Sequence, residues 1–223
     1  MKVLILVDEK NFEQSIFSLS RKRGEFRFID FNKIKNFILE YLNNNMQYKN
    51  CNLTHVRTYL YTGEYTDNLI QKIEKSINQN PDKEKYLKEL LIKSKKEQEK
   101  QRVFFKFAKS YYFFEIKSKP LQFSPSELRI FQKGVDVQLA VDLVDFTHKD
   151  IFDIAVVLSG DIDLLESIKA SKTMGKQIII FGDSSVIAEE MKKYSDMFVD
   201  IGRFTNEELD KFTHIPEKNK EKV

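Results

Sequence analysis

The stretch Ser159-Gly160-Asp161-Ile162-Asp163 decides the fold of this chain, because it places two carboxylates directly after a strongly apolar run. The run is Ile154-Ala155-Val156-Val157-Leu158, and after Asp163 the apolar residues recur at helical spacing. This pattern predicts a buried strand that turns into a helix. In open α/β sheets, ligands bind in the crevice at the carboxyl ends of the strands. Two acids so close together repel each other and favour a divalent cation, so the stretch indicates a metal site.

A second strand end of the same character lies at the N-terminus. Residues 1–7 read Met-Lys-Val-Leu-Ile-Leu-Val, Asp8 follows them, and Asn11 stands three residues further on. A nearly continuous apolar run suits a strand that is buried on both faces. Asp161 by itself would be explained as the cap of the following helix. If the two strands are parallel neighbours, however, Asp8, Asp161 and Asp163 converge at one edge of the sheet.

A third acid is placed differently, at the start of a helix. Residues 133–144 have the apolar spacing of an amphipathic helix, and Gly134 marks the turn before it. Asp136 lies in the first turn, where the helix dipole favours a negative charge, so a structural role and a functional role are equally supported. Asp142 lies about two turns further on, nearer the apolar face. It is either a partly buried acid with a partner or a group that supports the site from behind.

The order of these motifs resembles that of the NYN domain family, the LabA-like branch of the PIN-like ribonucleases. The resemblance runs from residue 1 to about residue 202 and depends on Lys133-Gly134-Val135-Asp136 together with Ser159-Gly160-Asp161-Ile162-Asp163. It implies a PIN-like three-layer α/β/α sandwich with a mainly parallel central sheet. It also implies an acidic cluster that binds Mg²⁺ or Mn²⁺, formed by Asp8, Asp136, Asp161 and Asp163, with Asn11 and Ser159 as polar support.

The chain departs from the family pattern at three places. Glu9-Lys10 stands between Asp8 and Asn11, where the family has glycine or another small residue, and Leu164 replaces the usual aromatic residue. Neither change removes a carboxylate. The region from about 64 to 110 is longer and more highly charged than the compact family pattern. This difference concerns the identity of the substrate and not the binding of a metal.

The resemblance implies a metal-dependent endoribonuclease. Asn11 would position a water or a phosphate oxygen, and Ser159 would orient Asp161 or contact the scissile phosphate. The alternative is a catalytically weak PIN-like module with a regulatory role, which binds RNA or a protein partner. Phosphatase chemistry through an aspartyl-phosphate is disfavoured, because that class needs a second acid two residues after Asp8, where this chain has Lys10.

A nuclease must also neutralise phosphates beside its acidic centre, so basic residues are expected around it. Lys133 is the strongest candidate, since it directly precedes the turn that presents Asp136, although an ordinary exposed lysine is an equal alternative. The other candidates are Lys10, Arg21, Lys22 and Arg23. The expected partner is RNA, single-stranded or structured. Residues 104–119 interleave lysines with aromatic residues, a pattern typical of single-strand binding, but core aromatics beside solvated lysines explain it better.

Composition narrows the protein class but does not identify a partner. The 223 residues carry a net charge of +3, which is too small to indicate nucleic-acid binding by itself. One cysteine excludes an internal disulfide framework, and the three histidines do not have zinc-ligand spacing. No apolar run reaches the length of a membrane span, and the N-terminal run lacks the features of a signal peptide. We therefore expect a cytoplasmic protein without a membrane partner. The sequence does not decide whether the protein forms homo-oligomers.

The remaining pattern alternates strands with helices, which predicts a parallel sheet covered on both faces. Strands are expected at 2–8, 53–61, 111–123, 153–159, 176–181 and 196–201. Helices are expected at 31–41, 66–77, 82–109, 134–148, 163–174 and 184–193, with a short helix or loop at 11–20. We expect one domain over residues 1–204, with the charged helical insertion at about 64–110. Residues 205–223 would form a short helix and a charged C-terminal tail.

Overall fold

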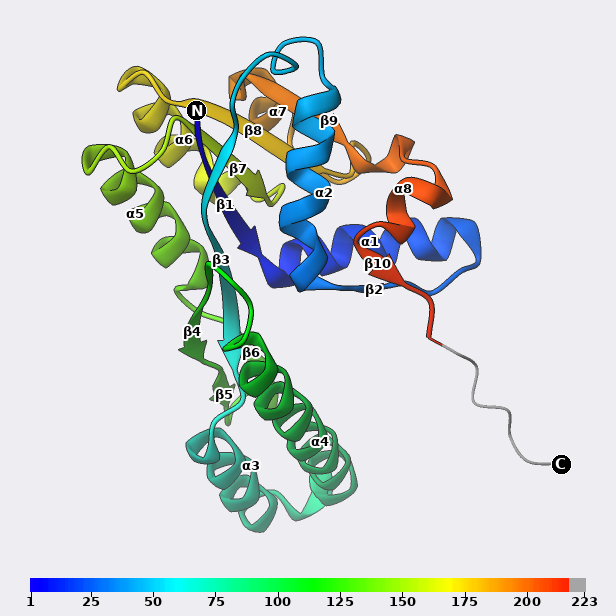
Figure 1. The fold of residues 1–223 in the computed structure, drawn as a ribbon. Helices are drawn as coiled ribbons and strands as arrows, with labels where there is room; N and C mark the ends of the chain where they lie inside the picture. Colours follow the sequence, from blue (N-terminus) through cyan, green and yellow to red (C-terminus); the bar gives the residue numbers. More distant parts are fainter. Residues whose placement is uncertain (217–223) are drawn as a thin grey trace, which may run out of the picture.

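The computed structural model describes residues 1–216, and its centre is a six-stranded sheet in the order β4-β3-β1-β7-β8-β9 (Figure 1). Every neighbouring pair of strands in this sheet is parallel. The strands are β1 (Lys2–Asp8), β3 (Thr54–Glu64), β4 (Phe114–Pro120), β7 (Ile154–Leu158), β8 (Gln177–Gly182) and β9 (Met197–Asp200). The predicted α/β fold with a parallel central sheet is therefore confirmed.

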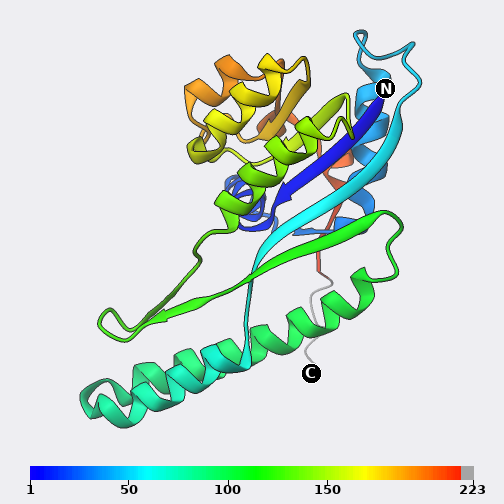
Figure 2. The same ribbon diagram turned by 90° about the vertical axis from the view of Figure 1, so that its left-hand side faces the viewer.

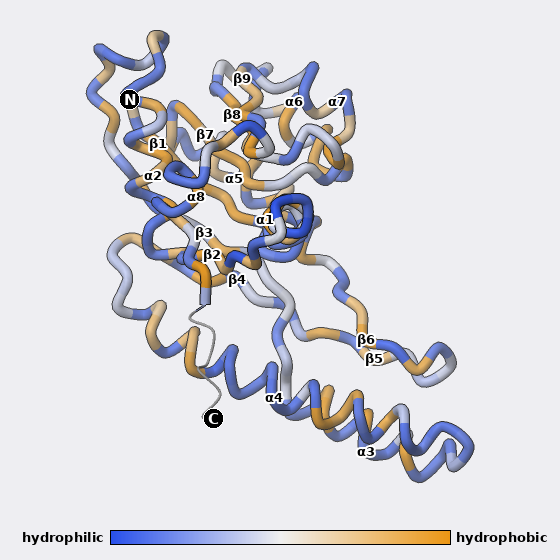
Figure 3. The backbone as a smooth tube through the Cα atoms, turned by 90° about the vertical axis from the view of Figure 1, so that its right-hand side faces the viewer, coloured by the Kyte–Doolittle hydropathy of each residue, from blue (hydrophilic) through white to orange (hydrophobic). Residues whose placement is uncertain are grey.

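Two hydrophobic layers show how helices cover both faces of this sheet. Along β1, Val3, Ile5 and Val7 belong to a core shared with α1 (Glu9–Arg23) and α2 (Phe31–Asn44). The alternate residues Leu4 and Leu6 belong to a core shared with α5 (Val135–His148), α6 (Leu165–Thr173) and α7 (Glu189–Tyr194). Successive side chains of a strand point to opposite faces of the sheet, so an apolar run without alternation is what a central strand requires. Figure 3 shows these central strands as the most hydrophobic part of the chain.

Local signals explain where the helices begin. For one helix, the start that was predicted from the sequence is wrong. The carboxylates of Asp8 and Asp30 cap α1 and α2, so the region 11–20 is a full helix that starts directly after β1. The helix expected at 184–193 begins only at Glu189. The preceding residues form a turn because Asp183 and Asp200 accept the backbone N–H groups of Ser185 and Ser184.

The charged insertion projects from the carboxyl edge of the sheet, beyond the ends of β3 and β4 (Figure 2). It contains α3 (Asp67–Gln79), a short 3-10 helix η1 (Pro81–Lys83) and α4 (Glu84–Ala108), and a hairpin of β5 (Gln122–Ser124) and β6 (Arg129–Phe131) packs against it. A small core of its own, formed by Leu69, Ile73, Leu87 and Phe123, holds these elements together. The hairpin returns the chain to the start of α5, beside the strand ends that carry the acids.

The last described residues pack against α1 and α2. Helix α8 (Asn206–Asp210) is followed by β10 (Thr213–His214), which pairs antiparallel with β2 (Phe28–Ile29). Phe212 lies in the main core, with its ring centroid 4.5 Å from that of Phe37. The boundary at residue 204 stays a prediction, and the expected tail at 217–223 lies outside the described residues. Among residues 1–216, no helix combines the length and apolar character that a membrane crossing needs.

Candidate metal centre

Three acids from distant parts of the sequence meet at the carboxyl edge of the sheet. Asp8 ends β1, Asp161 follows β7, and Asp136 lies in the first turn of α5. One carboxylate oxygen from each of them lies within 4.8 Å of the other two. They converge because β1 and β7 are parallel neighbours, with Val7 opposite Leu158, so that the two strands end at the same level. The structure thus brings together three of the four acids that were predicted to converge.

Asp8 is the most buried member of this cluster, with 2% of its surface exposed. It accepts a hydrogen bond from the backbone N–H of Asn11 at 3.2 Å and one from the hydroxyl of Ser159 at 3.0 Å. Burial raises the pKa of Asp8 to about 6, and repulsion from Asp136 and Asp161 adds to this effect. The two hydrogen bonds fix the orientation of the carboxylate without removing the cost of its charge.

Asp136 also carries a charge that its surroundings do not neutralise. Gly134, at φ +79°, makes the left-handed turn that leads into α5 and brings Asp136 to the cluster. Burial, followed by repulsion from Asp161 and Asp163, raises the pKa of Asp136, while Lys10 opposes the rise. Within residues 1–216, no lysine or arginine forms an ion pair with any of the three clustered acids. An all-oxygen donor set with unbalanced negative charge is the chemistry that a hard divalent cation needs.

The turn after β7 is tied to the start of α1 by a short chain of hydrogen bonds. The N–H of Gly160 donates to the side-chain oxygen of Asn11 at 2.7 Å, and the N–H of Asp161 donates to the hydroxyl of Ser159 at 3.2 Å. A Cβ on Gly160 would lie only 3.2 Å from Ile187, so the close approach suits glycine. Asn11 and Ser159 therefore link the two strand ends beside the acids, and the roles in catalysis expected for them stay predictions.

Asp163 lies at the rim of the cluster and not within it. It is exposed, and its N–H donates to the carboxylate of Asp161 at 3.0 Å. Its charge contributes to the raised pKa of Asp136, but its carboxylate is outside the group that lies within 4.8 Å. Asp142 is also outside the group and accepts the Tyr61 hydroxyl at 3.0 Å. Of the two roles considered for Asp142, the structure shows the partly buried acid with a partner.

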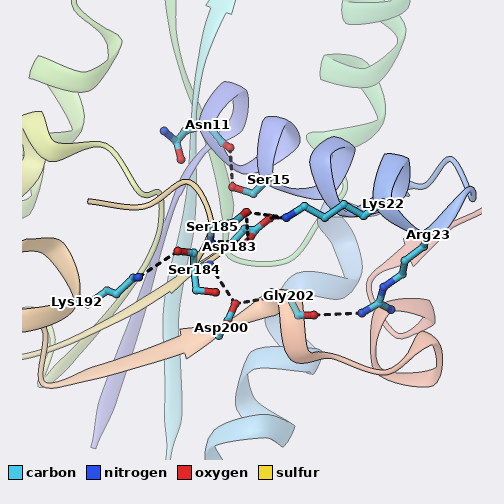
Figure 4. Close-up of polar contacts among 10 residues, drawn as sticks. All are labelled: Asn11, Ser15, Lys22, Arg23, Asp183, Ser184, Ser185, Lys192, Asp200 and Gly202. Carbon is cyan, nitrogen blue, oxygen red and sulfur yellow. Dashed lines mark hydrogen bonds and ion pairs between the residues drawn. The ribbon is translucent and has the colours of Figure 1, made fainter. Parts of the chain in front are cut away.

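The five candidate basic residues fall into two groups. Lys22 donates to Asp183 at 3.3 Å and to Ser185 at 2.7 Å, and Arg23 donates to the backbone oxygen of Gly202 at 3.3 Å (Figure 4). These two residues join α1 to the loops after β8 and β9. Lys10, Arg21 and Lys133 are exposed, and in the described part of the chain their side chains have no such partners.

Sequence reasoning missed two further acids near this edge. Burial, followed by repulsion from Glu13, raises the pKa of Glu9 to about 7, and its carboxylate accepts the hydroxyl of Thr62. The signal for Glu9 was its position beside the strand-end Asp8. Burial alone would raise the pKa of Asp183, but hydrogen bonds from Ser185 and Lys22 outweigh it and lower that pKa. Asp183 is therefore compensated, in contrast to Asp8 and Asp136.

Comparisons with known proteins agree with this architecture. A model of the NYN domain family matches residues 2–202. An uncharacterised protein of Methanocaldococcus jannaschii is 26% identical over 104 residues, a match that spans 43% of this chain and 43% of the archaeal protein. A crystal structure of a protein of unknown function from Vibrio parahaemolyticus superimposes with a TM-score of 0.54 at 16% identity, covering 96% of each chain, and this likeness concerns the fold alone. Because the family match covers nearly the whole sequence, the chain belongs to the NYN domain family.

Proposed function

We propose that this protein is a metal-dependent endoribonuclease in which Asp8, Asp136 and Asp161 hold one or two Mg²⁺ or Mn²⁺ ions. The observation that carries the proposal is the convergence of three carboxylates within 4.8 Å at the carboxyl edge of the sheet. A bound ion would activate a water for attack on a phosphodiester and stabilise the charge that develops on the leaving oxygen. Membership of a family of PIN-like nucleases supports the same reaction class.

The residues around the three acids would prepare them for this reaction. Ser159 and the backbone of Asn11 hold the Asp8 carboxylate in one orientation, so it would not have to reorganise when a cation binds. The side-chain oxygen of Asn11 accepts the N–H of Gly160, so its amide nitrogen would donate to a water or a phosphate oxygen. Asp163, at the exposed rim, would hold a water or a second ion.

Cleavage of RNA by the purified protein tests this proposal directly. We expect single-stranded RNA to be cleaved when Mn²⁺ or Mg²⁺ is present and not when EDTA is in excess. Asp161→Asn should slow cleavage by at least about 100-fold, which is about 2.7 kcal/mol of transition-state stabilisation. Asp145→Asn is the matched control, because Asp145 is paired with Lys149 on the outer part of α5 and should keep full activity. Metal-independent cleavage, or RNA binding without cleavage, would contradict the proposal and favour a binding module.

Lys133→Ala tests whether the exposed lysine before α5 contacts a substrate phosphate. We expect weaker RNA binding and a salt dependence flatter by about one phosphate contact. Metal affinity should stay unchanged, because Lys133 forms no bond with the clustered acids. The measurement is fluorescence anisotropy with a labelled RNA over a series of salt concentrations, and Lys149→Ala at the far end of α5 is the control. If the salt dependence of RNA binding is unchanged, Lys133 is an ordinary exposed lysine that contacts no phosphate.

A further inference from the structure

One face of α1 carries an exposed row of side chains that begins at the acidic cluster. Lys10, Gln14, Phe17 and Arg21 follow one another at spacings of four, three and four residues, so they share one side of the helix. All four are exposed. Eleven residues of α-helix rise by about 16 Å, so the row leads from the edge of the cluster to the far end of α1.

Three more aromatic side chains extend this row over the neighbouring strands β2 and β10, which lie beside α1 (Figure 1). Phe17 is 55% exposed and Phe26 is 60% exposed, and their ring centroids are 6.0 Å apart. Phe28 is 55% exposed, and its ring stacks on that of His214 at 5.9 Å with an interplanar angle of 27°. We call Phe17, Phe26, Phe28 and His214 the aromatic row.

The backbone under the aromatic row is held firmly. Phe26 and Phe28 alternate with Arg27, whose side chain points inward and is only 8% exposed as a residue. Arg27 forms ion pairs with Glu25, at 3.0 Å, and with Asp210. The phenylalanines are therefore presented to solvent by an anchored segment, at an energetic cost that folding alone does not explain.

The charges beside the aromatic row favour an anionic ligand. Lys22 and Arg23, on the other side of α1, are engaged in hydrogen bonds with the protein. In contrast, the side chains of Lys10 and Arg21 have no hydrogen bond or ion pair with another residue of the described part of the chain. Phe17 lies between these two cations on the same helix face. Cations for phosphates beside exposed rings for bases are the arrangement that binds single strands.

We propose that the aromatic row, with Lys10 and Arg21, binds a single-stranded stretch of nucleic acid and leads it to the acidic cluster. This inference rests on the proposed function and specifies its substrate as unpaired. Bases in a duplex are already stacked and paired, so they cannot lie against the rings. A purely apolar docking surface for a protein would not need an unpaired cation on either side of Phe17.

The test measures binding without cleavage. A fluorescein-labelled oligouridine of about 12 nucleotides and an RNA duplex of similar length are titrated with protein in EDTA. For the single strand, Phe17→Ala and Phe26→Ala should each raise Kd about tenfold, which corresponds to about 1.4 kcal/mol per ring. Duplex binding should change little. Arg21→Gln should flatten the salt dependence by about one phosphate contact. The control is Tyr86→Ala, since Tyr86 is 49% exposed near the start of α4, in the insertion and not on α1 or β2.

The outcomes separate this inference from the nuclease proposal. Unchanged single-strand affinity in the double variant Phe17→Ala/Phe26→Ala, at an unchanged melting temperature, overturns the aromatic row as a binding site. If this double variant loses affinity equally for the single strand and for the duplex, the inference is overturned as well. Loss of self-association without loss of RNA affinity would assign the row to a second copy of this chain and overturn the inference. If the wild type binds single strands through the aromatic row but does not cleave RNA in Mn²⁺, the aromatic row is a binding site and the nuclease proposal is wrong.

Discussion

Asp8→Asn is expected to make the metal-free protein more stable while it abolishes metal-dependent cleavage. Asp8 is 2% exposed, and its charge is opposed by burial and by Asp136 and Asp161. Near neutral pH the neutral amide removes both costs, so the free energy of unfolding should rise by about 2 kcal/mol. The Asn oxygen can still accept the N–H of Asn11, so the cap of α1 is retained. Urea denaturation in EDTA measures the change.

The same variant should lose the stabilisation that a metal gives to the wild type. A ligand that binds only the folded state stabilises it by about 2.7 kcal/mol at a concentration of 100 times its Kd. Mn²⁺ should therefore raise the melting temperature of the wild type and leave that of Asp8→Asn nearly unchanged. Asp142→Asn is the matched control, since Asp142 has Tyr61 and Lys117 as partners and its loss should not stabilise the protein. A less stable Asp8→Asn protein in EDTA would show that the acids are not electrostatically strained.

The three clustered acids could be predicted from sequence because each has a local signal. Asp8 and Asp161 end apolar runs of strand length, and Asp136 follows a glycine at the start of a helix. Parallel strands that end at one edge then bring Asp8 and Asp161 together without any detailed knowledge of packing, whereas the place of Asp136 in the cluster was implied by the family resemblance. Asp163 was expected in the cluster and lies at its rim, because the short 3-10 helix η2 (Ile162–Leu164) begins there. The capping bond from its N–H to Asp161 belongs to this turn, and its side chain stays in solvent.

The contacts that could not be predicted join residues that are far apart in the sequence and that no common sequence pattern connects. Lys22 and Asp183 are 161 residues apart, and only the packing of α1 against the loop after β8 makes them an ion pair. As a sequence, Arg21-Lys22-Arg23 is a uniform basic cluster, yet the fold engages two of its members and leaves Arg21 in solvent. The aromatic row depends in the same way on the pairing of β2 with β10, which places His214 against Phe28.

The stability of the metal-free protein should fall as the pH rises from about 4 to about 7. Burial raises the pKa of Asp8 from 3.8 to about 6 and that of Glu9 from 4.5 to about 7. Between the ordinary and the raised pKa, the folded state binds more protons than the unfolded state, so unfolding becomes easier as protons are removed. A shift of about 2 units corresponds to about 3 kcal/mol for a single group. His55 acts in the opposite direction, because burial lowers its pKa to about 4.

Glu9→Gln separates these contributions. The amide oxygen of Gln can accept the hydroxyl of Thr62, so the contact is retained while the titration is removed. We expect the variant in EDTA to be more stable than the wild type at pH values near 7 and nearly equal to it at values near 4, by urea denaturation. Mn²⁺ should remove the pH-dependent loss that comes from Asp8, since a coordinated carboxylate stays deprotonated in the folded state, but should leave the loss that comes from Glu9. Parallel pH profiles of the two proteins in EDTA would show that Glu9 titrates normally, and that its burial against Thr62 is not the source of the strain.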